Sequence, residues 1–151
     1  MHRLVGGRHT REDSIHLTLA FVGDVDSARL AELLAPPATL IVTRFKLTLD
    51  RWGCWPRNGI AWMAPSSVPD PLRELTAGMD AWLRYAGFEL DVRPFSPHVT
   101  LVRKAKCAPL PNLIPRIEWQ VEDFVLVRSA LEPDGSRYET IGRWRLLNAN
   151  S

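Results

Sequence analysis

Apolar and polar residues alternate along four segments of the chain, which is the pattern of strands with one buried face. These segments are residues 14–22, 45–50, 88–93 and 98–103. In the first of them, the side expected to face the core consists of Ile15, Leu17, Leu19 and Phe21. Residues 52–58 are typical of a hairpin-like loop, and a short strand at residues 59–64 is positioned to pair with it.

Apolar residues recur at helical spacing in two other segments, residues 27–35 and 71–86. Asp26 or Ser27 suits the N-cap of the first helix, because a short polar side chain there can accept a hydrogen bond from a free backbone N–H. Gly87 suits the position just after the second helix. The pattern therefore predicts two amphipathic helices.

The C-terminal third of the chain has a strand pattern with two interruptions. Residues 118–129 are strand-like, but the apolar phase slips at residues 122–123, which indicates a bulge or a turn. Residues 134–135 are a hairpin signal, and residues 136–141 with 143–147 supply the last strand or strands. The order of elements predicts an α+β domain with a mostly antiparallel sheet and helices packed on it.

Length and composition indicate one soluble globular domain over residues 1–151. Apolar residues make up 46% and charged residues 24% of the chain, which argues against intrinsic disorder. No apolar run approaches the roughly 18 residues of a membrane-spanning helix, and the N-terminus lacks the apolar stretch of a secretory signal. Cys54 and Cys107 form no CxxC motif, which argues against a disulfide scaffold or a zinc site. These features predict a cytoplasmic protein with no membrane partner.

The net charge of +2 does not by itself indicate a nucleic-acid-binding protein. The positive charge is nevertheless carried by 16 Arg and only 3 Lys. Arginine suits bidentate contact with phosphate, although a GC-rich genome would produce the same bias.

A repeated motif carries the candidate chemistry. Both His16–Thr18 and His98–Thr100 read His-x-Thr and are followed by Leu, whereas chance predicts about 0.2 such spacings in a chain of this composition. Residues i and i+2 of a strand point to the same face. If the two strands lie side by side, two imidazoles and two hydroxyls therefore form one cluster.

Such a cluster suits a phosphodiester. A neutral histidine can take a proton from an attacking hydroxyl, and a protonated one can give a proton to the leaving oxygen. Threonine hydroxyls can donate to the non-bridging phosphate oxygens, where charge builds in the transition state. No metal is required, and no carboxylate or cysteine lies at ligand spacing around either motif. A single His-x-Thr strand would be an ordinary structural feature; the repetition favours function.

At these residues the chain resembles the two-histidine (2H) phosphoesterase superfamily, whose signature is a pair of such motifs. The two histidines here are 82 positions apart. Within the superfamily, the chain is most similar to the bacterial RNA 2′,3′-cyclic phosphodiesterases, also called 2′-5′ RNA ligases. The similarity covers about residues 6–147 and is carried by residues 14–25, 45–63, 94–103 and 124–145.

The resemblance implies a bilobal α+β fold of two pseudo-symmetric halves, with two mostly antiparallel sheets around a central cleft and helices outside. It implies hydrolysis of RNA 2′,3′-cyclic phosphate ends to 2′-phosphomonoesters, reversible 2′-5′ joining of RNA ends, and no cofactor. It also implies that His16 is the proton donor, His98 the proton acceptor, and Thr18 and Thr100 the phosphate-binding residues. The two half-sites look alike, so the order of acid and base stays open.

The chain departs from the family at its N-terminus. Members normally begin with a strand and a helix before the first motif, whereas only 15 residues precede His16 here. We therefore expect this strand and helix to be missing from the sequence, and three explanations stay open: the true start lies further upstream, the chain is naturally short, or another segment fills the gap. Such a gap would expose a sheet edge and part of the core, and exposed apolar surface of this kind can drive dimerisation. The oligomeric state is not predicted.

Several other residues are candidates for contact with RNA. Arg103 follows the second motif, but strict alternation puts it on the face opposite His98, which leaves phosphate contact and a solvated rim position both open. Phe21 shares the core phase of its strand, which favours packing over base stacking. The remaining candidates are two aromatic residues and three loop arginines: Trp55, Tyr138, Arg51, Arg57 and Arg137.

Two alternative functions remain at this stage. The same chemistry would serve a small cyclic nucleotide or a 2′-5′ oligonucleotide. A chain without the first strand and helix could also be an RNA-end-binding module that no longer turns over. The four intact motif residues argue against the second alternative, and the short N-terminus argues for it.

Overall fold

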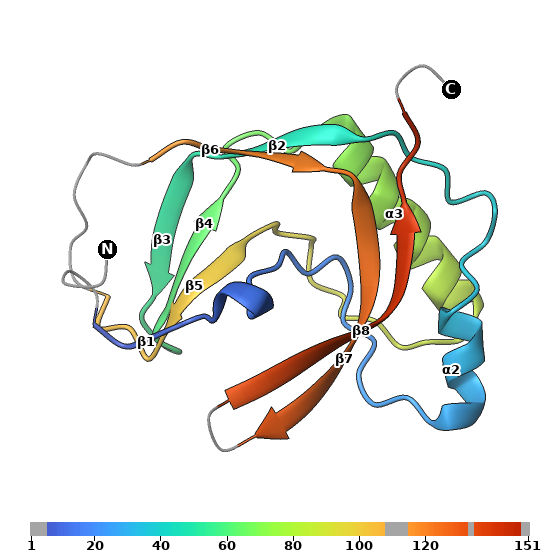
Figure 1. The fold of residues 1–151 in the computed structure, drawn as a ribbon, viewed down its shortest axis with the longest axis horizontal. Coiled ribbons are helices and arrows are strands. Elements are labelled where there is room, and N and C mark those ends of the chain that lie inside the picture. The colour runs from blue at the N-terminus through green and yellow to red at the C-terminus, as the bar shows by residue number, and fades with distance from the viewer. Residues whose placement is uncertain (1–5, 108–114, 133–134, 149–151) are drawn as a thin grey trace. The chain divides into compact units, whose positions relative to one another are not determined.

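The computed structural model describes residues 6–107, 115–132 and 135–148 (Figure 1). The expected α+β class with antiparallel strands is confirmed. The chain forms two compact units, each assembled from three stretches of sequence. The first unit consists of Met1–Thr18, Leu47–Val68 and Ser96–Trp119. The second consists of Leu19–Lys46, Pro69–Phe95 and Gln120–Ser151.

The first unit is built on an antiparallel four-stranded sheet (Figure 1). In spatial order its strands are β1 (Arg8–His9), β5 (Val99–Arg103), β4 (Ile60–Ala64) and β3 (Arg51–Trp55). One face of the sheet is the core, because the apolar side chains there are almost fully buried. This core face includes Ala61, Met63, Val99 and Val102.

The hairpin of β3 and β4 corrects two expectations. Residues 52–58 are not a loop throughout, because the strand continues to Trp55, which pairs with Ile60. Cys54 and Cys107 are joined by a disulfide with their Cα atoms 5.4 Å apart, although their spacing in the sequence argued against a disulfide scaffold. The pairing of β3, β4 and β5 brings Cys54 beside the segment that follows β5. A separation of 53 residues carries no local signal of this contact.

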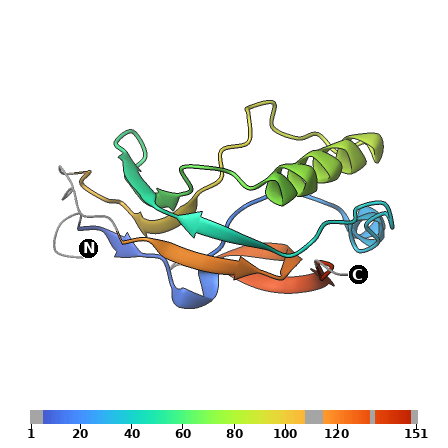
Figure 2. The ribbon, with the colours of Figure 1, turned by 90° about the horizontal axis from the view of Figure 1, so that it is seen from above.

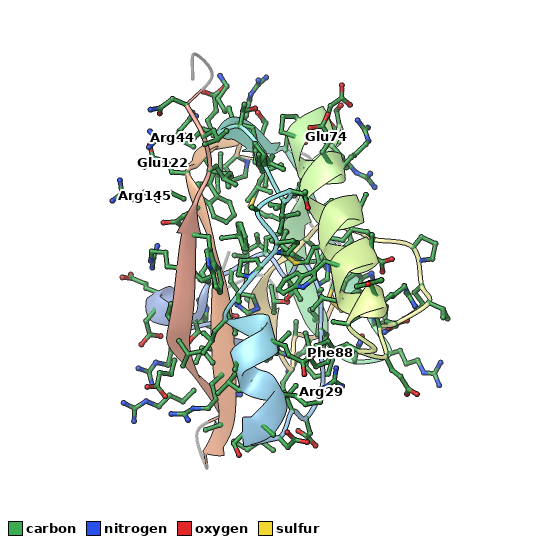
Figure 3. All side chains as sticks on the ribbon, turned by 90° about the vertical axis from the view of Figure 1, so that its right-hand side faces the viewer. Arg29, Arg44, Glu74, Phe88, Glu122 and Arg145 are labelled. Atoms are coloured by element: carbon green, nitrogen blue, oxygen red, sulfur yellow. A yellow bond between two sulfur atoms is a disulfide. The ribbon has the colours of Figure 1, made fainter. Side chains whose placement is uncertain are left out.

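The second unit contains the helices α2 (Ser27–Leu33) and α3 (Asp70–Tyr85) and the hairpin of β7 (Asp123–Glu132) and β8 (Gly135–Arg145). Both helices are confirmed, and Asp26 caps α2 by accepting from the Arg29 N–H at 2.9 Å. Figure 3 shows side chains filling the space between α3 and the hairpin. The Arg29 guanidinium lies 3.8 Å from the Phe88 ring centroid, which ties α2 to the segment after α3.

The remaining strands are β2 (Phe45–Leu49) and β6 (Ile117–Val121), which form a two-stranded sheet (Figure 2). The alternation in β2 is confirmed, because Phe45, Leu47 and Leu49 are buried. A break at Glu122 separates β6 from β7, as the slip in apolar phase predicts. The hairpin signal at residue 134 lies outside the described residues.

Two predicted strands do not form. Residues 88–93 have no strand pairing. Phe88, shortly after the end of α3, is nevertheless buried. Residues 14–22 pair only through a single bridge at Leu17, and a short 3-10 helix, η1 (Glu12–Ser14), precedes it. Ile15 and Phe21 are 47% and 75% exposed, so their assignment to the core is wrong. Alternation indicates which side of a strand can be buried, but burial also requires a neighbour to cover it.

Of the helices in the described part of the chain, none combines the length and apolar character needed to cross a bilayer.

Candidate active site

The two His-x-Thr motifs meet on the sheet of the first unit. Leu17 forms an isolated antiparallel bridge with Val99, whose side chain is on the buried core face. Because successive side chains alternate between faces, the neighbours of these two residues point to the opposite face. Those neighbours are His16, Thr18, His98 and Thr100. We call this side of the sheet the site face.

The bridge also sets which motif residues are opposite one another. In an antiparallel register through Leu17 and Val99, His16 lies across from Thr100 and Thr18 lies across from His98. Residues directly opposite have Cβ atoms roughly 4.5–5.5 Å apart. Each imidazole is therefore next to the hydroxyl of the other motif, and the two imidazoles are diagonal neighbours.

Both imidazoles are held in the same way. His16 Nδ1 lies 2.8 Å from the Ser14 carbonyl oxygen, and His98 Nδ1 lies 2.9 Å from the Ser96 carbonyl oxygen. A carbonyl oxygen can only accept, so Nδ1 is the protonated nitrogen of each neutral ring and donates. Nε2 is then the nitrogen that can exchange a proton with a ligand. In both motifs, the histidine ring is therefore held by the backbone carbonyl of the serine two residues earlier in the chain.

An aromatic pair borders His98 on the site face. The Trp55 ring centroid lies 4.8 Å from that of His98 at an interplanar angle of 78°, and 5.4 Å from that of Trp62. A Cβ on Gly53 would lie 2.5 Å from the Trp62 ring, so glycine at this position lets that indole lie across β3. Trp55, considered from sequence only as a base-stacking residue, therefore packs against a motif histidine.

Arg103 also belongs to the site face, which corrects the prediction from strict alternation. Ala61 pairs with Val102 but Trp62 pairs with Thr100, so Leu101 is an extra residue in β5, a β-bulge. Beyond the bulge the phase of the strand is reversed, and Arg103 shares the face of Thr100. In the sequence, the only sign of this bulge is that two adjacent residues, Leu101 and Val102, are apolar and both pack in the core.

The carboxylate of Asp50, in the first unit, holds the two ends of the β3–β4 hairpin together. Asp50 accepts hydrogen bonds from the hydroxyl and the backbone N–H of Ser66, each at 2.7 Å. These bonds hold the pKa of Asp50 below its ordinary value. Asp50 therefore stays ionised and joins the start of β3 to the segment after β4.

The other sequence candidates fall into two groups. Arg51 on β3 and Arg57 in the following turn are exposed residues of the first unit. Three belong to the second unit: Phe21, Arg137 and Tyr138.

Known proteins match this chain over most of its length. The sequence profile of the 2′-5′ RNA ligase superfamily matches residues 4–132. The RNA 2′,3′-cyclic phosphodiesterase of Escherichia coli (strain K12) is 32% identical over 143 residues, which cover 93% of this chain and 80% of that protein. The Thermus thermophilus protein of the same name is 34% identical over 145 residues, covering 87% of this chain and 72% of that protein.

Solved structures agree with the sequence matches. A crystal structure of a phosphoesterase superposes with a TM-score of 0.81 at 32% identity, over 93% of this chain and 81% of that one. The crystal structure of E. coli LigT complexed with 3′-AMP gives a TM-score of 0.80 at 32% identity, with the same coverage of both chains. The resemblance carried by the two motifs is thereby confirmed, and the chain belongs to the 2′-5′ RNA ligase superfamily.

Proposed function

We propose that this protein hydrolyses RNA 2′,3′-cyclic phosphate ends to 2′-phosphomonoesters, with reversible 2′-5′ RNA ligation as a related reaction. The observation that carries the proposal is the Leu17–Val99 bridge, because it gathers two imidazoles and two hydroxyls on one face. The activity named for the E. coli and T. thermophilus relatives supports the same substrate.

The proposed reaction uses the motif residues as acid, base and hydrogen-bond donors. His98 Nε2 takes a proton from a water molecule as the water oxygen attacks phosphorus. The bond between phosphorus and O3′ breaks, and protonated His16 gives its Nε2 proton to O3′, which leaves the phosphate on O2′. Thr18 and Thr100 donate hydrogen bonds to the non-bridging oxygens, where negative charge increases.

The backbone contacts of the two histidines support Nε2 as the nitrogen that exchanges the proton in each ring, whichever ring is the acid. Ser14 and Ser96 each accept a hydrogen bond from Nδ1, so each ring presents Nε2 to the substrate. The chemistry needs no metal ion.

A purified preparation and a labelled oligoribonucleotide ending in a 2′,3′-cyclic phosphate test the proposal directly. We expect conversion to the 2′-phosphate end, undiminished by excess EDTA. The rate should fall at acid pH, where the base is protonated, and at alkaline pH, where the acid is deprotonated. The matched control is the protein with both His16→Ala and His98→Ala. Loss of activity in EDTA with recovery in zinc or manganese would contradict the acid–base mechanism.

Two alternatives are separated by the same assay. Faster turnover of a small cyclic nucleotide or of a 2′-5′ oligonucleotide than of the RNA end would change the substrate and keep the chemistry. Tight binding of the RNA end without turnover would identify a binding module.

A cytoplasmic location and an RNA partner are part of the proposal. The Cys54–Cys107 disulfide weighs against this location, because such bonds are rare in reducing compartments. The location is tested by blocking free thiols in intact cells before lysis. A cytoplasmic location predicts that both cysteines are recovered as thiols.

A further inference from the structure

The disulfide joins the hairpin that carries Trp55 to the segment that follows the second motif strand, and all of these parts belong to the first unit. Cys54 of β3 pairs with Ala61 of β4, which is completely buried on the core face. Cys54 packs against this core, so its neighbour Trp55 extends from the opposite face of β3, the site face. The bond therefore fixes the backbone of β3 from the core side, one residue before the indole that contacts His98.

A hydrogen bond links the same end of the hairpin to the same segment. The Ala105 N–H donates a hydrogen bond of 2.8 Å to the Gly59 carbonyl oxygen, in the turn between β3 and β4. A Cβ on Gly59 would lie 3.1 Å from the Ala105 carbonyl oxygen, so the turn packs closely against residues 104–107. When the disulfide opens, the turn and this segment are joined by noncovalent contacts, which separate at a lower cost in free energy.

The backbone of the segment after β5 favours a change of conformation once the disulfide opens. Lys104 and Cys107 have φ angles of +56° and +46°, in the left-handed region that residues with a Cβ seldom adopt. Such conformations are unfavourable and persist where surrounding contacts impose them. The covalent bond at Cys107 is one of these contacts. Reduction therefore removes a constraint from a segment whose present backbone conformation is unfavourable.

Small thiols can reach the bond. Both cysteines are only partly buried, and thiol–disulfide exchange requires access to a sulfur atom. Lys104 and Lys106, close to Cys107 in the chain, are exposed cations. Glutathione disulfide carries a net negative charge at neutral pH, because its carboxylates outnumber its amines. The Cys107 end of the pair therefore attracts it.

We propose that the Cys54–Cys107 pair is a reversible redox switch, closed by glutathione disulfide and opened by reduced glutathione, that sets how firmly Trp55 holds the His98 ring. In the closed state the indole packs against the imidazole as in the structure. In the open state residues 104–107 are released from β3, and the Trp55 end of the hairpin loosens. A reducing cytoplasm keeps the switch open, and oxidative conditions close it. The effect on turnover rests on the proposed function, whereas the effect on the contact between Trp55 and His98 does not.

Closure follows ordinary thiol–disulfide exchange. The Cys107 thiolate attacks one sulfur of glutathione disulfide, which forms a mixed disulfide and releases one glutathione thiolate. The Cys54 thiolate then attacks the Cys107 sulfur, which completes the protein disulfide and releases the second glutathione. The two protein thiols are oxidised, glutathione disulfide is reduced, and the two thiol protons end on the released glutathione molecules. Opening is the reverse sequence.

Activity in defined glutathione buffers tests the switch. The wild type is equilibrated at increasing ratios of reduced glutathione to glutathione disulfide, its free thiols are counted by alkylation, and kcat is measured on an RNA end with a 2′,3′-cyclic phosphate. We expect kcat to fall by about threefold as the disulfide opens, because a less firmly positioned imidazole reacts more slowly. Cys54→Ser and Cys107→Ser should have the low value at every ratio. Trp55→Leu should form the same disulfide but lose the redox dependence of kcat.

The imidazole signals in NMR spectra separate a switch at Trp55 from a general loosening of the protein. The ring current of the indole shifts the signals of the His98 ring protons, because the two rings are in contact. On reduction these signals should move toward their positions in Trp55→Leu, while those of His16 stay in place. His16 is the matched internal control, because its ring is held by the same kind of backbone contact in the other motif.

Four results would overturn the proposal. Equal kcat and unchanged His98 signals in the two redox states would leave the bond without influence on the site. Equal shifts of the His16 and His98 signals would indicate general loosening. Redox dependence that persists in Trp55→Leu would exclude the indole contact as its cause. A bond that reduced glutathione opens at no ratio would be a permanent cross-link. If the wild type hydrolyses the RNA end in neither redox state, the proposed function fails, and the His98 signals then decide the switch.

Discussion

The two motif segments carry the same His-x-Thr-Leu residues but receive unequal support from the fold. The second motif is on β5, which pairs with β1 on one side and β4 on the other, and Val99 and Val102 are only 2% and 1% exposed. The first motif is held by one bridge at Leu17, and Ile15 beside it is 47% exposed. One bridge is enough to orient a histidine and a threonine, whereas a full ladder and a covered face are needed to stabilise a strand.

This inequality gives the two motifs different local stability. Segments with few buried contacts open at lower free energy than core strands. Substrate that contacts both motifs would therefore order the first one more than the second. The chemistry of the two half-sites can be equivalent even though their stability is not.

The largest expected effect tests whether the chemistry is indeed equivalent. His16→Ala and His98→Ala should each lower kcat on a 2′,3′-cyclic phosphate end by roughly 10²–10⁴. Thr18→Ala and Thr100→Ala should lower it less, because each removes one hydrogen bond to phosphate. Single-turnover rates measure the step directly, and near-wild-type turnover in either histidine variant would exclude that residue as acid or base.

The disulfide lies in the part of the sheet that carries the second motif. Reducing it should therefore narrow the difference in local stability between the two motif segments. It links β3 to the segment after β5. Reduction, or Cys107→Ser, should lower the free energy of unfolding by about 2–4 kcal/mol and speed amide exchange in β5. Denaturant titrations with and without reductant measure the first effect. Equal midpoints under both conditions would mean that the bond adds no stability.

Shortening the side chains of the two bridge residues, Leu17 and Val99, compares how much each motif segment contributes to the free energy of unfolding. Val99→Ala should lower the free energy of unfolding by about 1–3 kcal/mol, because the side chain is almost fully buried. Leu17→Ala removes more carbon but should have the smaller effect, since Leu17 is only half-buried. Urea unfolding of the two variants gives both values. A larger loss for Leu17→Ala would show that the first motif is the better packed of the two.

Trp55 makes the two half-sites unequal, because it borders the second motif. Its replacement has the smallest expected effect. The indole contacts His98, so Trp55→Leu should lower kcat by about threefold to tenfold by loosening that ring, with little change in KM. Trp55→Phe should recover most of the loss. The pH profile separates this from a structural effect: only the limb that reports His98 should move. A rise in KM at constant kcat would instead indicate base stacking.

Local patterns were sufficient for the parts of the protein whose structure depends on neighbours in sequence. The apolar spacing at residues 71–86 predicts α3 to within a residue at each end, and the alternation in β2 predicts its buried face. The spacing of His16–Thr18 and His98–Thr100 places each pair on one face of an extended segment. These features follow from the periods of helix and strand, which the sequence contains directly.

Only the tertiary structure decided which segments become neighbours. Residues 88–93 alternate like a strand but find no partner, and the first motif finds only a single bridge. The bulge at Leu101 turns Arg103 to the site face, where β1 brings Arg8 beside it. Strand pairing, register and bulges are set by contacts between residues far apart in sequence. The alternation of one strand can therefore identify a face of the site but not the residues that come to share it.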